Sequence, residues 1–202
     1  MAPDQVVGVQ FPSLPAKSVK ELIAISRQRP SQINYASSGT GSTVHLSAEL
    51  MQFMTGIKWI HIPYKGGGLA MQELLAGQTS LMFPNLPTAL QFARTGKLRT
   101  LAVTGVKRSG AAPELPTVAE TVPGFEVTTM YGVSAPAKTP RPIIDRLHAE
   151  FVRALNAPDL RGRMVDIGAD PVGSTPEEYT AFIQSEIAKW AKVINAAGIK
   201  GE

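Results

Sequence analysis

The hydrophobic pattern of residues 6–104 alternates between two periods. Short, nearly continuous apolar runs predict strands, and segments with an apolar residue at every third or fourth position predict amphipathic helices. Strands are expected at 6–11, 33–35, 59–62, 79–83 and 98–104, and helices at 18–27, 42–55, 69–76 and in a segment ending at 94. Repeated strand–turn–helix units with apolar strands are typical of an α/β fold, a parallel-rich sheet with helices on both faces.

The pattern changes after Gly105. A proline-bearing loop leads to a short helix with a capping box at Thr117 and Glu120, and an extended segment at 125–135 could connect two domains. The remainder is mainly helical, with a helix start predicted at Thr175-Pro-Glu-Glu178. Two apolar stripes mark these helices: Ile143, Ile144, Leu147, Phe151 and Leu155, and then Tyr179, Phe182, Ile183, Ile187, Trp190 and Ile194.

The candidate functional site is the turn between the second expected strand and the helix at 42–55. It reads Asn34-Tyr-Ala-Ser-Ser-Gly-Thr-Gly-Ser-Thr-Val-His45. A glycine-rich helix start leaves several backbone N–H groups unpaired, and the positive end of the helix dipole favours an anion there. The hydroxyl groups add polarity without adding charge. We expect a carboxylate or another small oxyanion to bind at Ser37, Ser38, Gly39, Thr40, Gly41, Ser42 and Thr43.

Two further turns follow the third and fourth expected strands. Ligands of open parallel sheets bind at the carboxyl ends of the strands, where all three turns should lie. Tyr64 and Lys65 of the second turn could donate to the same ligand, or this turn could serve only to reverse the chain. Asn85 of the third turn is a further candidate, although asparagine commonly bonds within its own turn.

Composition narrows the possible classes of function. The chain has 202 residues, 44% of them hydrophobic and 18% charged, so it has the apolar content to form a core. The net charge of +4 comes from scattered basic residues, which argues against a nucleic-acid partner. Cysteine is absent, which excludes disulfides and thiolate chemistry. No apolar run approaches the roughly 20 residues of a membrane span, and residues 1–8 have no features of a secretory signal.

Familiar catalytic and cofactor motifs do not fit. Gly39-Thr-Gly41 lacks the third glycine of a dinucleotide fingerprint, because Val44 stands in its place. The phosphate-loop pattern and the Gly-x-Ser-x-Gly elbow are both missing. The three histidines, His45, His61 and His148, fall in different expected elements without metal-ligand spacing. We therefore expect no catalytic residue, no metal and no cofactor.

The histidines nevertheless leave alternatives open. His45 lies one turn into its helix, where it could reach the anion site or could simply pack or cap locally. A small α/β hydrolase or transferase would pair Ser38 or Ser42 with His45, but the missing elbow and the lack of a nearby acid count against this class. His61 is expected to be a core or edge residue, and His148 to be solvated.

Several segments carry a resemblance that runs nearly the full length of the chain. They are Pro12–Leu22, Asn34–Ser42, His45-Leu46, Ile62–Gly66, Leu101–Thr104, Lys107-Arg108, Leu115–Glu120, Gly132–Pro136, Gly173–Glu178 and Glu186–Trp190. In this order and spacing, they resemble the substrate-binding proteins of tripartite tricarboxylate transporters, the Bordetella uptake gene (Bug) type.

The resemblance implies a fold and a function. The expected fold is periplasmic-binding-protein-like, with a complete middle lobe at 6–127 and the mainly helical C-terminal part of the other lobe at 128–202. The implied function is that of an extracytoplasmic, non-enzymatic receptor that closes on a small organic carboxylate. It would deliver the ligand to two integral-membrane subunits, from the periplasm, although this chain has no signal peptide. The implied ligand contacts are Ser37, Ser38, Gly39, Gly41, Ser42 and Thr43.

Two departures from the family pattern change this expectation. Pro84 stands where members commonly carry aspartate, which leaves the ligand class open. The N-terminal segment of the other lobe is expected to be absent. This second lobe is therefore expected to be incomplete, and ligand binding to be impaired. The helical stripes of 128–202 would then expose a large apolar patch, and self-association through this region is expected. A further interpretation is a truncated remnant that acts only as an assembly module.

Overall fold

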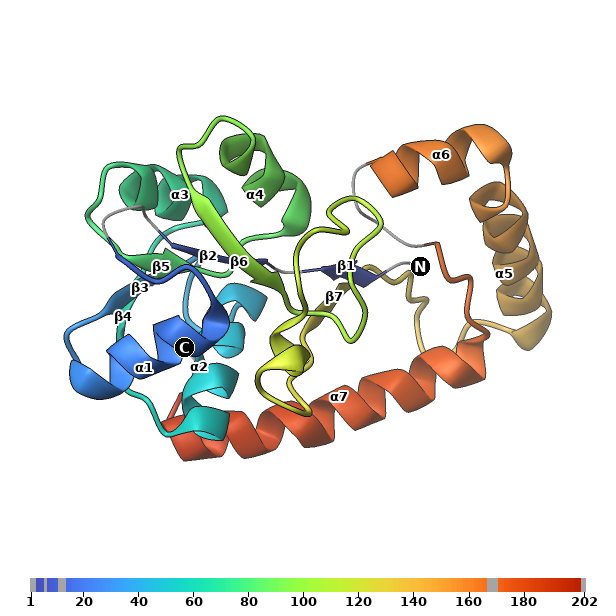
Figure 1. Cartoon of the computed structure of the whole chain (residues 1–202). Helices are drawn as coiled ribbons and strands as arrows, with labels where there is room; N and C mark the ends of the chain where they lie inside the picture. The colour runs from blue at the N-terminus through green and yellow to red at the C-terminus, as the bar shows by residue number, and fades with distance from the viewer. Residues whose placement is uncertain (1–2, 6, 11–13, 167–170, 201–202) are drawn as a thin grey trace.

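A five-stranded sheet in the order β4-β3-β5-β2-β6 forms the centre of the N-terminal region (Figure 1). The computed structural model describes residues 3–5, 7–10, 14–166 and 171–200. The strands are β2 (Val7–Gln10), β3 (Asn34–Ser37), β4 (Ile60–Pro63), β5 (Leu81–Met82) and β6 (Arg99–Val103). β3 is parallel to β4 and β5, as predicted, whereas β2 lies antiparallel between β5 and β6. An apolar run has no direction, so the hydrophobic pattern could not reveal how β2 is oriented.

Four predicted helices flank this sheet, with α1 and α2 on one side and α3 and α4 on the other (Figure 1). They are α1 (Val19–Gln28), α2 (Thr43–Thr55), α3 (Gly67–Leu75) and α4 (Leu86–Ala93). A capping box at the start of α1 is only half formed. Ser18 accepts from the Glu21 N–H, but the Glu21 carboxylate accepts from the Lys17 N–H instead of that of Ser18.

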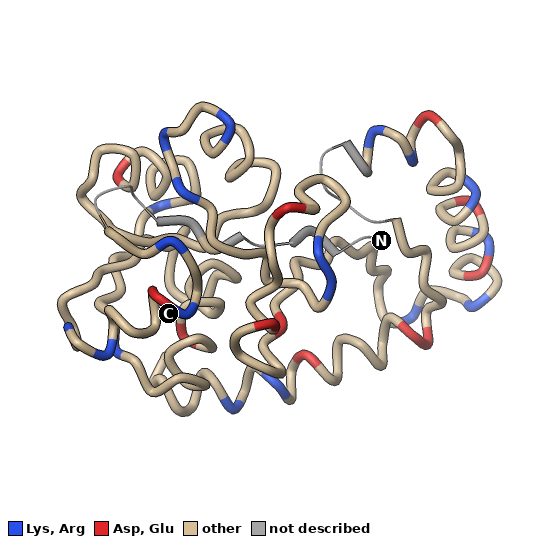
Figure 2. Tube along the Cα trace, viewed as in Figure 1, with Lys and Arg blue, Asp and Glu red and all other residues tan. Residues whose placement is uncertain are grey.

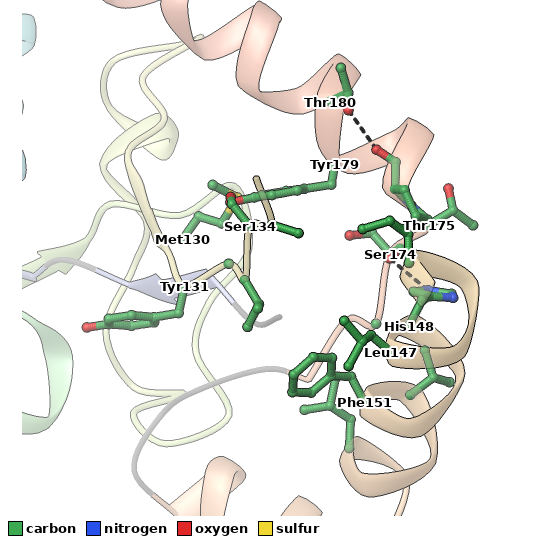
Figure 3. A pocket seen from close by; sticks show the side chains of 18 of the residues that line it. Met130, Tyr131, Ser134, Leu147, His148, Phe151, Ser174, Thr175, Tyr179 and Thr180 are labelled. Atoms are coloured by element: carbon green, nitrogen blue, oxygen red, sulfur yellow. Dashed lines mark hydrogen bonds between the residues drawn. The ribbon is translucent and has the colours of Figure 1, made fainter. Parts of the chain in front are cut away.

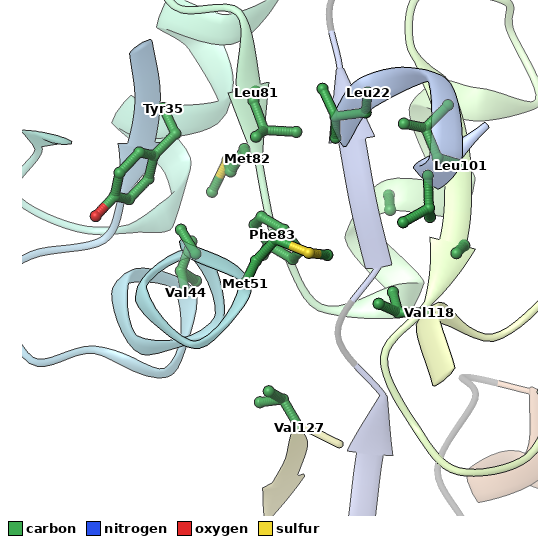
Figure 4. Close-up of a cluster of buried hydrophobic side chains, with 14 of the residues drawn as sticks. Leu22, Tyr35, Val44, Met51, Leu81, Met82, Phe83, Leu101, Val118 and Val127 are labelled. Atoms are coloured by element: carbon green, nitrogen blue, oxygen red, sulfur yellow. The ribbon is translucent and has the colours of Figure 1, made fainter. Parts of the chain in front are cut away.

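The hydrophobic core lies between this sheet and its helices. Figure 4 shows Tyr35, Met51 and Phe83 at its centre, where each is almost completely buried. The Trp59 indole N–H donates to the Ser26 hydroxyl, so these two buried polar groups are paired. Of the buried apolar side chains among the described residues, Val193 alone comes from beyond residue 127.

The C-terminal region begins with β7 (Thr128–Met130), which pairs antiparallel with β1 (Pro3–Gln5). It continues with α5 (Arg141–Leu155), α6 (Pro158–Asp166) and α7 (Pro176–Ala197). The capping boxes predicted at Thr117 and Thr175 are both present, before the short 3-10 helix η1 (Val118–Glu120) and before α7. Neither β1 nor α6 was predicted, because β1 is a three-residue strand that depends on a distant partner and α6 has no apolar stripe.

The two predicted apolar stripes of this region have different environments. α7 runs along the molecule to pack on α2, where Val193 is buried and Trp190 contacts the core (Figure 1). α5 buries none of its side chains, and Ile143, Leu147 and Phe151 are 50%, 44% and 46% exposed. Within the described part of the chain, no helix combines the length and apolar character that a membrane span requires.

Candidate functional site

The turn between β3 and α2 has a backbone shape that requires its two glycines. Gly39 and Gly41 have φ angles of 130° and 76°, in the region that disfavours residues with a side chain. Ser42 is the N-cap of α2, and its hydroxyl accepts from the His45 N–H at 3.3 Å and donates to the Gly39 carbonyl at 2.7 Å. Ser42 therefore fixes the turn, as well as lying within the predicted anion site.

Buried side chains hold two backbone N–H groups of the turn. The Gly39 N–H donates to Ser37 Oγ at 3.2 Å, and the Gly41 N–H donates to His45 Nδ1 at 3.0 Å. Ser37 and His45 are only 0% and 4% exposed, so both bonds lie beneath the turn. The N–H groups of Ser38, Thr40 and Thr43 take part in none of the hydrogen bonds of the described turn. Together with the start of α2, they are unpaired backbone donors of the kind to which anions commonly bind.

A layer of aromatic and ionisable side chains supports the turn from below. The imidazoles of His45 and His61 stack with centroids 3.8 Å apart and planes 6° from parallel, and the Tyr35 ring stacks on His61 at 5.0 Å. His61 Nε2 lies 2.6 Å from Ser37 Oγ. The Tyr35 hydroxyl donates to Glu49 Oε1 at 2.5 Å, and His45 Nε2 lies 3.7 Å from the same oxygen.

The two imidazoles are neutral at pH 7. Burial lowers the pKa of His45, and burial followed by the proximity of His45 lowers the pKa of His61 to about 4. His45 must also be neutral to accept a bond at Nδ1, which places its proton on Nε2, toward Glu49. Burial and the bond to Glu49 raise the pKa of Tyr35, which keeps its hydroxyl a donor.

The second and third predicted turns lie at the same edge of the sheet, because β3, β4 and β5 are parallel. The Tyr64 N–H donates to the Ser37 carbonyl at 3.0 Å, so the 64–66 turn sits directly against the first turn. Lys65 beside it is exposed, whereas Tyr64 is partly buried. Asn85 is the N-cap of α4 but makes no side-chain capping bond, and its amide lies 3.5 Å from the Tyr131 hydroxyl.

Sequence reasoning missed several residues of this arrangement. Glu49 and Gln52 lie one and two turns along α2 from the site, and the amide of Gln52 donates to Glu49 at 2.7 Å. Only the register of β3 on β4, which pairs Tyr35 with His61, could have signalled the aromatic stack. Tyr131 comes from the extended segment predicted to connect two domains, and nothing in its local sequence marks it as a neighbour of Asn85.

The geometry gives no support to the serine–histidine alternative. The acceptor nitrogen of His45 is occupied by the Gly41 N–H, and Ser42 is used as a helix cap. Ser37 does contact an imidazole, that of His61, but its side chain is buried and beyond the reach of a substrate. Among the described residues, no three acidic, histidine or cysteine side chains are grouped to hold a metal ion.

A separate hollow of about 660 Å³ lies in the C-terminal region, between α5, α6, α7 and residues 130–139 (Figure 3). Its labelled side chains include Leu147, Phe151 and Tyr179, and the lining is mainly apolar. Tyr179 packs so closely on Gly132 that a Cβ atom there would overlap its ring. The prediction that His148 is solvated was wrong, because it is partly buried on this wall and its Nε2 lies 3.1 Å from the Ser174 carbonyl.

Charged side chains are spread over both regions (Figure 2). Several basic residues are paired: Arg108 contacts Glu120, and Arg141 contacts both Asp145 and Glu177. These pairs neutralise part of the basic charge of the described residues.

Comparisons with known proteins agree with the resemblance seen in the motifs. The family model described as the tripartite tricarboxylate transporter family receptor matches residues 1–199. Protein BugT of Bordetella pertussis is 37% identical over 196 residues, which cover 96% of this chain and 60% of that protein. The solved structure of R. palustris Rpa4515 with adipate has a TM-score of 0.89 and 38% identity, covering 98% of this chain and 67% of that chain.

A second solved structure is that of MatC (Rpa3494) from Rhodopseudomonas palustris with bound malate. It has a TM-score of 0.82 and 29% identity, covering 96% of this chain and 67% of that chain. The fold prediction is therefore confirmed, and the receptor family is the one the motifs indicated. The matched part of the chain spans 54% and 60% of the length of the first two curated relatives.

Proposed function

Because this chain belongs to the tripartite tricarboxylate transporter receptor family, we propose that its β3–α2 turn binds a small organic carboxylate as part of an extracytoplasmic solute receptor. The observation that carries this proposal is the set of backbone N–H groups at Ser38, Thr40 and Thr43, beside the start of α2. Donors of this kind, at the positive end of a helix dipole, stabilise a carboxylate without a fixed counter-charge.

The ligand we propose is a small dicarboxylate. Two solved relatives are described with adipate and with malate, which both carry two carboxylates. One carboxylate would lie on the first turn, within reach of Ser38, Thr40 and Thr43. Exposed Lys65 lies on the neighbouring turn and adds favourable charge for an anion.

We take residues 6–127 and 128–202 as parts of the two lobes between which the ligand binds. The distribution of the core supports this division, because Val193 is the one buried apolar side chain beyond residue 127 among the described residues. Closure of such lobes on a ligand is ordinary hinge motion. A receptor of this family would work in the periplasm and pass its ligand to two integral-membrane subunits.

We further propose that the 202-residue chain by itself binds its ligand weakly and self-associates. The exposed stripe of α5 and the mainly apolar hollow beside it support this proposal, because a partner on this face would remove these apolar side chains from water. We take a second copy of the chain as the partner that covers this face. Weak binding would follow because the described contacts of the site come mainly from one region.

A thermal-shift screen with adipate, malate and citrate tests the binding function. Binding to the native state raises stability by RT ln(1 + [L]/Kd), so a true ligand raises Tm in a concentration-dependent way. The assembly-module interpretation would gain support if a stable oligomer forms and none of the three acids raises Tm.

Thr43→Pro is the sharpest variant for locating the ligand. Thr43 is the first residue of α2, where proline is well tolerated, and Ser42 has an extended conformation that suits the residue before a proline. The substitution removes one N–H donor and keeps the helix. We expect adipate affinity to fall about 10-fold to 100-fold, since a hydrogen bond to a charged group is worth about 1.5–3 kcal/mol.

Thr43→Ala is the matched control, because it removes the hydroxyl and keeps the N–H. It should bind adipate within about threefold of the parent chain if the backbone donor dominates, by the same hydrogen-bond arithmetic. Equal affinity of Thr43→Pro and the parent chain in a calorimetric titration would show that the start of α2 does not contact the ligand.

A further inference from the structure

The N–H groups of Gly39 and Gly41 point beneath the β3–α2 turn, toward the stacked imidazoles of His45 and His61. Gly41 reaches His45 directly, and Gly39 reaches His61 through the Ser37 hydroxyl. We propose that His45 and His61 are positioning residues for the carboxylate turn, which keeps its ligand-binding shape only while both imidazoles are uncharged. This inference rests on the proposed function, and it concerns residues that do not themselves touch the ligand.

The role of His45 follows from its two ring nitrogens. Nδ1 accepts from the Gly41 N–H at 3.0 Å, whereas Nε2 faces Glu49 Oε1 at 3.7 Å. A proton added to Nδ1 would place two donors against each other and break the bond that holds Gly41 in its left-handed conformation. Glu49 favours the tautomer with the proton on Nε2, so it keeps Nδ1 available as an acceptor.

The role of His61 follows from the Ser37 hydroxyl. Ser37 Oγ accepts from the Gly39 N–H, so its own hydrogen must go to another acceptor. His61 Nε2 at 2.6 Å is closer than the Gly39 carbonyl at 3.2 Å, and it is the better partner. A proton on His61 Nε2 would make the imidazole the donor, so the hydroxyl hydrogen would have to turn to the Gly39 carbonyl, the longer contact at 3.2 Å.

The surroundings of the pair make its protonation costly. Two ionisable groups face the pair. Glu49 of α2 offsets part of this cost, because its carboxylate attracts a positive charge on either ring, whereas the hydroxyl of Tyr35 on β3 already donates to Glu49. The two rings lie 3.8 Å apart, so a charge on one opposes a charge on the other. Burial lowers the pKa of both histidines, that of His61 to about 4.

The direction of the pH effect follows from these lowered pKa values. The neutral imidazole pair contributes all of its stabilisation of the folded turn at pH values above the usual histidine pKa of about 6.5. Part of the stability is lost as the pH falls from there toward the folded value of about 4 for His61, and ligand affinity falls as the native pair itself gains a proton. Neutral replacements should therefore bind with less dependence on acid pH than the parent chain.

A crossed pair of substitutions tests the proposal. Asparagine places its side-chain oxygen near the position of Nδ1, and glutamine places it near that of Nε2. Calorimetry with adipate at pH 7 should find His45→Asn close to the parent and His45→Gln about tenfold weaker, the loss expected from one hydrogen bond. At the other ring the order should reverse, with His61→Gln close to the parent and His61→Asn weaker.

The pH profile distinguishes positioning from simple packing. His45→Asn should lose less adipate affinity than the parent chain between pH 7 and pH 4.5, although the ligand protonates equally in both experiments. Equal affinities of His45→Asn and His45→Gln at pH 7, or identical pH profiles of His45→Asn and the parent chain, would overturn the proposal.

A measurement without ligand separates this inference from the proposed function. Nitrogen-15 NMR of the parent chain at pH 7 should show His45 Nδ1 unprotonated, with slow hydrogen exchange at the Gly41 amide. A protonated Nδ1 would contradict the inference even if the substituted chains fail to fold. If neither adipate nor malate binds while exchange at Gly41 is faster in His45→Gln than in His45→Asn, the receptor function fails and the positioning of the turn stands.

Discussion

Helices α1 and α5 both carry an apolar stripe at helical spacing, but only α1 buries it. α1 places Val19, Leu22 and Ile23 in the core of the N-terminal region. α5 has no buried side chain, although Ile143, Leu147 and Phe151 form an equally regular face. The difference shows that periodicity identifies which face of a helix requires a partner, whereas the presence of that partner depends on the rest of the fold.

The same contrast separates the candidate site from the apolar hollow. The β3–α2 turn stands on a complete core and is fixed by paired buried groups, so its donors are held in place before a ligand arrives. Such preorganisation lowers the entropic cost of binding. The hollow beside α5 has walls of exposed apolar side chains and suits a covering partner better than a small anion.

The largest expected effect on stability compares a buried phenylalanine of the N-terminal core with an exposed phenylalanine of α5. Phe83 is 1% exposed, so Phe83→Ala should lower the free energy of unfolding by about 3–5 kcal/mol. Phe151 is nearly half exposed, so Phe151→Ala should cost less than about 1 kcal/mol in the monomer. Urea unfolding of dilute protein, followed by tryptophan fluorescence, measures both values. Similar losses would mean that Phe151 is covered in solution and would remove the contrast.

The next effect concerns self-association through α5. Phe151→Glu places a charge on the exposed stripe and should weaken association at least about tenfold, because burying an unpaired charge costs more than 1.4 kcal/mol. Phe53→Glu is the matched control, since Phe53 is also exposed but lies on α2 in the other region. Sedimentation velocity over a range of concentrations measures the change. A compact monomer in the parent chain, with no binding of an apolar dye, would rule out this prediction.

The smallest expected effect compares the two capping boxes. Thr117 is buried at the edge of the N-terminal core, whereas Thr175 is exposed at the start of α7. Thr117→Ala should lower the free energy of unfolding by about 1–2 kcal/mol, and Thr175→Ala by about 0.5–1 kcal/mol. Thermal unfolding of the two variants, with serine at each position as the control, measures the difference. A larger loss at Thr175 would place the start of α7 among the elements that limit stability.

Local signals in the sequence predicted most of the secondary structure. The capping boxes at Thr117 and Thr175 and the alternating apolar runs all depend on neighbours within a few residues. Short-range hydrogen bonds and backbone sterics decide these features, so a single sequence contains the necessary information. The same reasoning failed for β1, whose pairing with β7 spans most of the chain.

The candidate turn was predicted, but its support was not. Glycine content and helix position identified residues 37–43, since both features are local. The bond between Gly41 and His45 is also local, yet the orientation of the imidazole depends on Glu49 and on the stack with His61. Side-chain rotamers in a packed core are set by all of their neighbours together, so spacing alone could not distinguish packing from positioning.

The sequence by itself therefore determined most of the elements, the glycine-rich turn and the apolar faces that need partners, because each follows from periodicity and local backbone chemistry. The tertiary structure alone decided the direction of β2, the joining of Asn85 to Tyr131 and the stacking of His45 on His61. These features bring together residues far apart in the chain, and their energies depend on distances that only the folded chain defines.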